Sequence, residues 1–267
     1  MLTSIDSYVF FEDGIRKAAE FFKDNVVVEQ AVTYKLNNGV SITLPESYTD
    51  VAFKPIFNEC KGATNFLDLA YFYGLVHSSG VLIDNQLRIY LKPYHIQNQV
   101  IEFIRGVLKK YAKATPMIQM DEVNDTKVLY INNFNQIAKK LEFNIQHVPT
   151  PMFSMTQEAV FVYVYQLFSS AIEVRDAYEL RFLNEQFANE VAMLLSMLCI
   201  PYYLDLVFVR IPEKAFKAIC EKPQVVIIKE PPFYKVIDTY KVGFKPFVEI
   251  DCIGVNGAKL FWKEVIS

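Results

Sequence analysis

Several features that mark common kinds of protein site are scarce in this chain. Its 267 residues include only three His, four Cys and one Trp. The cysteines form no CxxC pair, which disfavours a zinc site and is typical of reduced thiols in an intracellular protein; they are Cys60, Cys199, Cys220 and Cys252. Nothing in the sequence indicates a metal ion or another cofactor, so we expect none.

Long apolar runs are also missing. No stretch approaches the length of a transmembrane helix, and residues 1–11 lack the basic and then apolar pattern of a signal peptide. We therefore expect a soluble protein of the host-cell cytoplasm that makes no contact with a membrane.

The chain lacks an excess of basic charge. Lys and Arg number 27 and Asp and Glu number 30, which gives a formal net charge of −3. Proteins that wrap duplex DNA usually carry a basic stripe, because neutralising phosphates supplies much of their affinity. Net charge does not report how charge is distributed, so a local basic patch stays possible. The balance nevertheless disfavours tight nonspecific DNA binding.

What the chain does contain is enough apolar sequence for folded domains, and its two ends alternate in the manner of β-strands. Residues 15–22 favour a short helix, and the sequence Asn37-Asn38-Gly39 favours a hairpin turn. The expected strands of the two ends are 8–11, 26–36, 40–44, 225–228, 235–240, 247–253 and 258–262, and a further strand, 202–209, is expected within the middle of the chain. We expect residues 1–65 and 225–267 to pair into one mostly-β domain.

The middle of the chain, 66–224, contains an internal repeat with copies at about 66–148 and 149–224. Each copy begins with an apolar helix, continues with two short strands and then forms a second helix. The expected elements are 66–79, 81–83, 87–91 and 95–113 in the first copy, and 156–170, 172–174, 178–183 and 185–198 in the second. An offset of roughly ninety residues indicates a pseudo-twofold duplication.

The first helix of each copy carries a motif. Residues 70–80 read AYFYGLVHSSG and residues 164–171 read VYQLFSSA, with Gln166 at the place of Gly74. The first motif resembles the LAGLIDADG motif of homing endonucleases, and the second resembles it less closely. The resemblance implies an α+β fold with an αββαββα repeat, in which the two motif helices pack together and the strands form a DNA-facing saddle.

The flanking segments show a second resemblance. Residues 1–9 and 12–17 are similar to the first block of an intein, residues 39–47 to its second block, and residues 236–266 to its closing blocks. The combined resemblance implies a LAGLIDADG-type domain inserted in a mostly-β Hint (intein-like) domain.

The residues that splicing needs in inteins are absent. The resemblance places Met1 where a nucleophilic Cys begins an intein, and a thioether cannot attack a carbonyl carbon. Ser47 stands at the position of a catalytic His, and the chain ends in Ser267 without a His-Asn pair. We therefore expect no self-splicing.

The residues that cleave DNA in homing endonucleases are absent as well. The resemblance places one acidic metal ligand at the end of each motif helix, where this chain has Ser79 and Ala171. The preceding acidic positions hold His77 and Ser169. We expect a protein that is not an enzyme. We also expect His77 to be a structural residue, and His95 and His147 to be surface or capping residues.

Binding is the function that remains, and two kinds of partner stay open. Because the basic stripe is missing, we favour a protein partner in a phage or mobile-element setting, with Phe53, Phe57, Phe233 and Tyr234 as possible anchors. The alternative is a non-cleaving, sequence-specific regulator that binds double-stranded DNA. Its candidate contacts are Asn85, Gln86, Arg88, Tyr90, Lys92, Arg175 and Arg181. A metal-independent or partner-activated nuclease is a third hypothesis.

Overall fold

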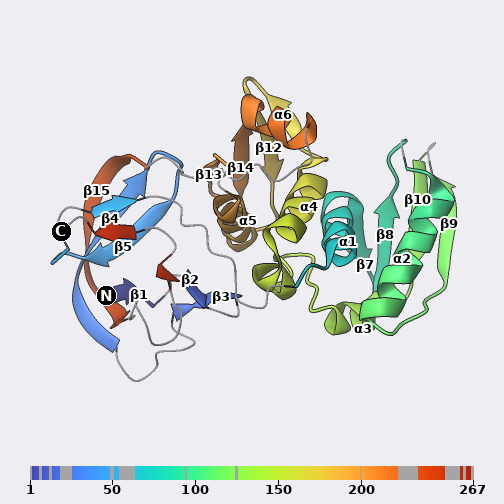
Figure 1. Ribbon diagram of the computed structural model, residues 1–267, viewed down its shortest axis with the longest axis horizontal. Coiled ribbons are helices and arrows are strands. Elements are labelled where there is room, and N and C mark those ends of the chain that lie inside the picture. The colour runs from blue at the N-terminus through green and yellow to red at the C-terminus, as the bar shows by residue number, and fades with distance from the viewer. Residues whose placement is uncertain are drawn as a thin grey trace.

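The computed structural model has a mixed α/β fold with two regions, one of helices packed on sheets and one of strands (Figure 1). The residues it describes are 2–5, 8–11, 14–18, 26–48, 51–53, 64–93, 95–123, 126–198, 200–221, 234–249, 259–260 and 263–265. No helix within these ranges combines the length and the apolar character that crossing a membrane requires.

The first repeat follows the order αββαββα. Its four strands form one antiparallel sheet in the order β7-β8-β10-β9. Its elements are α1 (Leu67–Ser79), β7 (Gly80–Ile83), β8 (Gln86–Tyr90), α2 (Gln97–Tyr111), β9 (Ile118–Val123), β10 (Thr126–Ile131) and α3 (Phe134–Lys140). The sequence predicted α1, the first hairpin and α2, whereas β9, β10 and α3 were not predicted.

The second repeat has the same order and an equivalent sheet, β11-β12-β14-β13. A 3-10 helix, η2 (Thr150–Ser154), leads into it. Its elements are α4 (Gln157–Phe168), β11 (Ile172–Val174), β12 (Ala177–Arg181), α5 (Glu185–Met197), β13 (Tyr203–Asp205), β14 (Phe208–Pro212) and α6 (Glu213–Glu221). The prediction of a single strand over 202–209 was wrong, because Leu206 adopts a left-handed conformation with φ 51° in a turn that separates β13 from β14.

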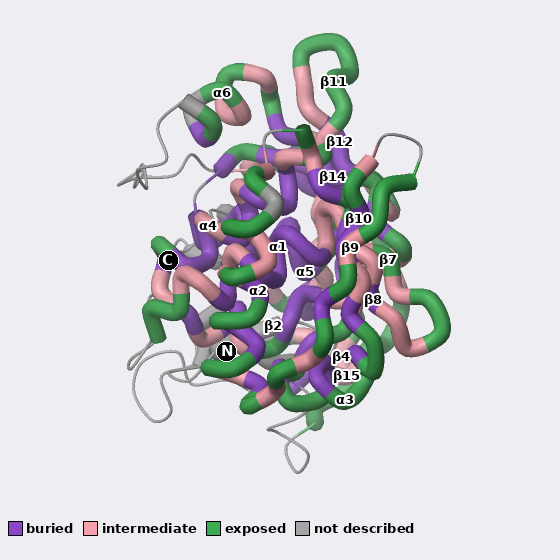
Figure 2. Tube along the Cα trace, turned by 90° about the vertical axis from the view of Figure 1, so that its right-hand side faces the viewer, coloured by how far each residue is buried: buried purple, intermediate pink, exposed green. Residues whose placement is uncertain are grey.

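The two motif helices, α1 and α4, lie side by side between the two sheets (Figures 1 and 2). They approach closely at Gly74, where an added Cβ would lie 2.8 Å from the Cβ of Gln166 and 2.8 Å from the carbonyl oxygen of Tyr163. Gly74 therefore makes room for the Gln166 side chain that replaces the second motif's usual glycine. Both helices are apolar on most sides because each is buried by a sheet and by the other helix.

Two side-chain caps help to fix where the helices of the second repeat begin. The Thr156 hydroxyl accepts a hydrogen bond from the Ala159 N–H at the start of α4, and the Asn184 side-chain Oδ1 accepts one from the Phe187 N–H at the start of α5. Such caps satisfy backbone donors that have no partner within the helix.

The second region brings together strands from both ends of the chain. Its largest sheet has the order β1-β15-β4-β5, and smaller sheets join β16, β2 and β3, and β17 with β6. The bounds are β1 (Leu2–Ser4), β2 (Tyr8–Phe11), β3 (Gly14–Lys17), β4 (Val26–Leu36), β5 (Ser41–Pro45), β6 (Val51–Phe53), β15 (Val236–Glu249), β16 (Lys259–Leu260) and β17 (Lys263–Val265).

Three predictions for this region need correction or cannot be compared. Gly14–Lys17 form the strand β3, paired with β2, where the sequence predicted the start of a helix. β15 is one long strand where two were predicted, because the irregularity at Gly243, with φ 76°, bends the ladder without ending it. The strand predicted over 225–228 lies outside the described residues.

The two regions meet at the turn between β4 and β5. The Leu204 N–H on β13 donates a hydrogen bond of 2.7 Å to the carbonyl oxygen of Asn38. Gly39 has φ +86°, and an added Cβ would lie only 1.8 Å from the carbonyl oxygen of Leu204. Only glycine fits here, both for its backbone conformation and for the space it leaves. The turn thereby holds the strand region against the outer edge of the second sheet.

Candidate functional site

Each sheet of the repeats has one face against the helices and one face away from them. On β8, Leu87 and Ile89 are fully buried in the core, so the alternating residues Gln86, Arg88 and Tyr90 point to the opposite face. On β14, Val209 and Ile211 are buried in the same way, which places Arg210 on the opposite face. We call the two faces that point away from the helices the saddle.

Three candidate contacts from the first repeat, Asn85, Gln86 and Arg88, lie together at one tip of the saddle, and Gln86 and Arg88 are joined by a hydrogen bond. Arg88 Nε donates to Gln86 Oε1 at 2.9 Å, and Gln86 Nε2 donates to Asn132 Oδ1 at 2.8 Å. Asn85, in the hairpin turn, lies within 3.5 Å of Asn133. Together with Ile83 and Asp84 they line an open concavity of about 340 Å³. Tyr90 follows on the same strand and is exposed.

Lys92 does not lie free on the saddle as the DNA-binding hypothesis required. Its Nζ donates hydrogen bonds to the carbonyl oxygen of Ser169 at 2.6 Å and to Ser169 Oγ at 2.9 Å. Partial burial lowers the pKa of the Lys92 ammonium. The side chain thus ties the first repeat to the end of α4, where the partial negative charge of the helix terminus attracts a cation.

In the second repeat Arg175 occupies a hairpin turn, with φ 57°, and Arg181 is exposed with its guanidinium 5.8 Å from the Phe208 ring centre. Arg210 lies on the same saddle face as Arg181. It forms an ion pair with Glu179, and its guanidinium lies 6.0 Å from the Tyr203 ring centre. Sequence reasoning missed Arg210 because β14 was not separated from β13. Recognising a second hairpin would have shown that Arg210 alternates with two buried aliphatic residues.

The saddle strands carry no excess of positive charge. Arg88, Arg181 and Arg210 are matched in number by acidic residues of the same faces, which are Asp121, Glu179 and Asp205. Each of these arginines also lies within about 6 Å of an aromatic ring.

Aliphatic side chains are exposed at equivalent places on one edge strand of each sheet. They are Val81 and Ile83 on β7, 44% and 37% exposed, and Ile172 and Val174 on β11, 64% and 36% exposed. Tyr90 and Tyr203 add partly exposed rings. A surface with balanced charge and an apolar component differs from a surface built to hold phosphates.

The ends of the motif helices carry hydroxyl groups. α1 ends at Ser79, whereas α4 ends at Phe168 and is followed by Ser169 and Ser170. Counted back from the two hairpin turns, the counterpart of Ser79 is Ser170, one residue before the predicted Ala171. The Ser170 hydroxyl donates to the Leu167 carbonyl oxygen at 3.0 Å.

These helix ends do not fit a divalent cation, which prefers several hard oxygen ligands such as carboxylates. Among the described residues there is no group of three or more His, Cys, Asp or Glu side chains placed to hold a metal ion. At the other degenerate site, Ser47 is exposed and donates to Glu29 Oε2 at 3.2 Å, and Met1 lies outside the described residues.

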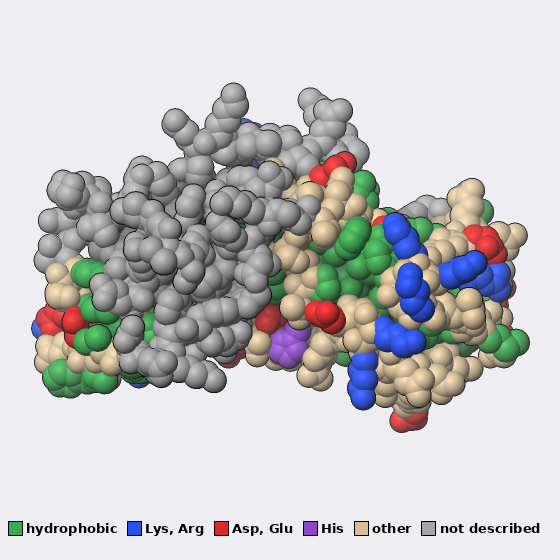
Figure 3. Space-filling model, turned by 60° about the horizontal axis from the view of Figure 1, so that its bottom comes forward, with side chains coloured by type: hydrophobic (Ala, Val, Ile, Leu, Met, Phe, Trp, Pro, Cys, Tyr) green, Lys and Arg blue, Asp and Glu red, His purple; other side chains and the backbone are tan. Residues whose placement is uncertain are grey.

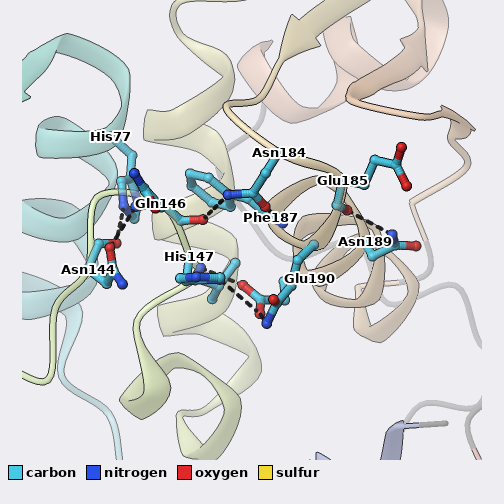
Figure 4. Close-up of polar contacts among 11 residues, drawn as sticks. His77, Asn144, Gln146, His147, Asn184, Glu185, Phe187, Asn189 and Glu190 are labelled. Carbon is cyan, nitrogen blue, oxygen red and sulfur yellow. Dashed lines mark hydrogen bonds and ion pairs between the residues drawn. The ribbon is translucent and has the colours of Figure 1, made fainter. Parts of the chain in front are cut away.

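His77 is a structural residue that joins the two repeats (Figure 4). Its Nε2 lies 3.2 Å from the Asn144 carbonyl oxygen and its Nδ1 lies 2.9 Å from the Tyr163 hydroxyl. The first contact requires a proton on Nε2, so Nδ1 accepts from Tyr163. The ring packs against Phe143 and Phe187, and burial lowers its pKa to about 4. A neutral imidazole with both nitrogens engaged is consistent with the structural role predicted for it.

The connection between the repeats is held against α5 by Glu190, which is 5% exposed (Figure 4). Glu190 Oε2 accepts the Val148 N–H at 2.8 Å, Oε1 accepts Gln186 Nε2 at 3.0 Å, and His147 Nδ1 lies 3.5 Å from Oε1. His147 therefore belongs to a partly buried contact rather than to an open surface. His95 does not cap α2, which begins without a side-chain cap; its Nδ1 instead accepts the Lys92 N–H at 3.1 Å in the loop before the helix.

The aromatic residues proposed as anchors are not shown on an open surface. Tyr234 packs against the small core around Leu36 and Leu44. Phe57 and Phe233, and the side chain of Phe53, lie outside the described residues.

No protein-family model matches the chain, and no curated protein is similar to it. Solved structures do resemble it. The homing endonuclease I-DmoI in complex with DNA and Ca is 14% identical over 58% of this chain and 87% of its own, with a TM-score of 0.41. The N-terminal LAGLIDADG domain of WhiA is 12% identical over 61% of this chain and 84% of its own, with a TM-score of 0.39.

The homing endonuclease I-WcaI bound to its DNA recognition sequence is 14% identical over 60% of this chain and 83% of its own, with a TM-score of 0.31. The structural neighbours are thus LAGLIDADG proteins, and they resemble this chain over little more than half of its length. A Hint or intein structure is not among these neighbours.

Proposed function

We propose that this protein acts by binding a protein partner through the saddle and that it does not cleave nucleic acid. The observation that carries the proposal is the composition of the saddle strands, where three arginines are matched in number by three acidic residues and aliphatic side chains are exposed on one edge strand of each sheet. The partner would present apolar side chains toward β7 and β11 and mixed charges toward the outer strands. Such a surface combines apolar and charged side chains, as protein interfaces do.

The ends of α1 and α4 support the absence of cleavage. Ser79, Ser170 and Ala171 offer no carboxylate, and the Lys92 ammonium already occupies the end of α4. We further propose that the flanking strands derive from a Hint domain that no longer splices. In this proposal the chain is a domesticated relative of inteins and homing endonucleases from a phage or another mobile element.

A second candidate function is a non-cleaving regulator that reads duplex DNA. It is favoured by the hydrogen-bonded row of Arg88, Gln86 and Asn132 at one tip of the saddle, where Asn85 lines the same concavity. Amide and guanidinium groups pair with base edges in the major groove. The row covers one sheet only, whereas the balanced charge extends over both, so we place this function second.

The test compares two variants of the full-length protein that alter the saddle in different ways. Val81→Lys with Ile172→Lys places charges on the apolar edge strands, and Arg88→Gln with Arg181→Gln removes two candidate DNA contacts. Each is used with wild type to capture host proteins and to titrate labelled duplexes. A host protein that the lysine variant loses and the glutamine variant retains would support a protein partner. Sequence-selective duplex binding that the glutamine variant loses would establish the DNA regulator instead.

The absence of cleavage is tested by restoring acidic residues. Ser79→Asp is combined with Ser170→Asp in one variant and with Ala171→Asp in another. Wild-type protein should leave supercoiled plasmid intact with Mg²⁺ or Mn²⁺. Nicking that appears only in an acid-restored variant would confirm which residues correspond to the catalytic positions. Nicking by wild type would overturn the proposed loss of activity.

A further inference from the structure

The helical side of the first repeat carries a dense group of exposed cations. Figure 3 shows Lys and Arg side chains gathered over this part of the molecule. We call this group the basic face. It consists of Arg105, Lys109 and Lys110 on α2, Lys113 just after α2, and Lys139 and Lys140 on α3, all of them exposed.

The basic face lies on the side of the first sheet opposite to the saddle. Ile104 and Leu108 of α2 are buried in the same core as Leu87 of β8. Arg88, next to Leu87, points the other way, onto the saddle. The exposed cations of α2 and the saddle are therefore separate surfaces.

Acidic neighbours neutralise only part of the basic face. Glu102 pairs with Arg105, and Asp68 pairs with Lys110 at 3.0 Å. The Lys113 ammonium donates to a backbone carbonyl oxygen, that of Lys110. Within the described part of the chain, Lys109, Lys139 and Lys140 form no ion pair. Four cations are thus available to an anion.

Helix termini explain some of this charge, because cations near a C-terminus interact favourably with the helix dipole. The second repeat shows that the fold does not require them. α5, the counterpart of α2, has no basic residue in its last turn, and residues 182–209 contain no Lys or Arg at all. In a chain of net charge −3, the concentration of cations on one face of one repeat therefore points to a ligand.

The surroundings of these cations favour phosphate over a protein surface. A protein interface needs an apolar or aromatic centre to contribute affinity. Neither α2 nor α3 exposes a large apolar side chain. Lysines on a polar helical face instead suit a row of phosphates, which needs positive charge but no shaped pocket.

We propose that the basic face binds the phosphate backbone of nucleic acid without sequence preference. This binding is independent of the saddle and of the partner proposed for it. Together the two surfaces make the protein an adaptor that holds a protein partner close to nucleic acid.

The experiment measures fluorescence anisotropy of a short labelled duplex of random sequence with the full-length protein. Four phosphate contacts predict that affinity falls roughly a hundredfold between about 50 and 200 mM salt. Lys109→Gln with Lys113→Gln, and Lys139→Gln with Lys140→Gln, should each weaken binding at low salt by about tenfold, and the fourfold variant should abolish it. The matched control is Lys214→Gln with Lys217→Gln on α6 of the second repeat, which removes the same charge and should leave affinity unchanged.

Four outcomes would overturn the proposal: no binding at low salt, equal binding by the fourfold variant, equal loss in the α6 control, or competition by polyglutamate as strong as that by unlabelled duplex. Because all the substituted residues are exposed, circular dichroism should show the wild-type fold in every variant. Loss of duplex binding in the Arg88→Gln, Arg181→Gln variant alone would instead assign the nucleic-acid contact to the saddle. That result would contradict both the proposed role of the basic face and the proposed protein partner of the saddle. Failure to capture a partner would contradict only the proposal for the saddle.

Discussion

The two repeats share one order of elements but differ in how their second helices are covered. α2 exposes a polar face that includes Asn98, Glu102, Arg105 and Lys109. In α5, every described side chain from Glu190 to Leu198 is buried. In Figure 1, α5 lies on the side of the molecule toward the β1-β15-β4-β5 sheet, whereas α2 lies on the outer side.

The two repeats therefore share the order of their helices and strands, whereas the burial and the partners of equivalent residues depend on the elements packed around them. Glu102 and Glu190 are each the sixth residue of their helix. Glu102 is 71% exposed and pairs with a neighbouring arginine, whereas Glu190 is buried and holds the connection between the repeats. The same residue is a solvated charge in one repeat and a structural anchor in the other.

The largest expected effect compares these two glutamates. Glu190→Ala leaves the Val148 N–H and the Gln186 amide without their acceptor, and should lower the free energy of unfolding by about 2–4 kcal/mol. Glu102→Ala should change it by less than about 0.5 kcal/mol, because exposed ion pairs contribute little. Urea denaturation measures both. Equal costs would show that the two helices are equivalent after all.

The second prediction concerns acid. His77 has a folded pKa of about 4, below its unfolded value of 6.5, so the folded state resists protonation. Its contribution to stability is complete above pH 6.5 and is lost as the pH falls toward 4, by about 2–3 kcal/mol. Urea unfolding over this range should show a steep decline for wild type and a shallower one for His77→Gln. An identical decline in both would remove His77 as the cause.

The third prediction tests the contact between the motif helices. Gly74→Ala brings a methyl group against Gln166 and the Tyr163 carbonyl oxygen, and should destabilise the protein by about 1–2 kcal/mol despite the better helix propensity of alanine. Gln166→Ala in the same chain should recover part of this loss, because it removes one of the two obstructing groups. Thermal melts of the single and double variants measure the recovery. If the double variant loses more stability than the two single variants lose together, this packing is contradicted.

The smallest effect is expected at the basic face. Lys109→Gln with Lys113→Gln should change the free energy of unfolding by less than about 0.5 kcal/mol, because both side chains are exposed and form no ion pair among the described residues. Urea denaturation is again the measurement. A larger loss of stability would show that these two lysines stabilise the C-terminal end of α2. That would be a further difference from α5, which has no basic residue there.

Part of the fold follows from local patterns. The apolar stretches predicted α1 and α4, the strands on either side of the Asp84-Asn85-Gln86 turn predicted the first hairpin, and the pattern from about residue 185 to 198 predicted α5. β9 was missed because its polar and acidic residues, such as Asp121 and Glu122, give a weak apolar pattern on an exposed edge. β10 was missed as well, although it is an inner strand that ends in an apolar run. The strand β3 overrode the helical spacing of its residues because it pairs with β2.

The candidate site divides in the same way. The sequence placed Gln86, Arg88 and Tyr90 on one face because strand side chains alternate. It could not show that Lys92 folds back onto Ser169, or that Arg210 faces Glu179, since both contacts depend on distant segments.

By itself, the sequence determined that the chain has a duplicated helix and hairpin unit, and that no carboxylate stands at Ser79, Ser170 or Ala171. Residue types and their periodicity carry that information, because they act within a single helix or hairpin. Only the tertiary structure decided which charges remain free. Packing buried Glu190, paired Arg210 and left the lysines of α2 and α3 in solvent, since burial and pairing depend on what each helix packs against.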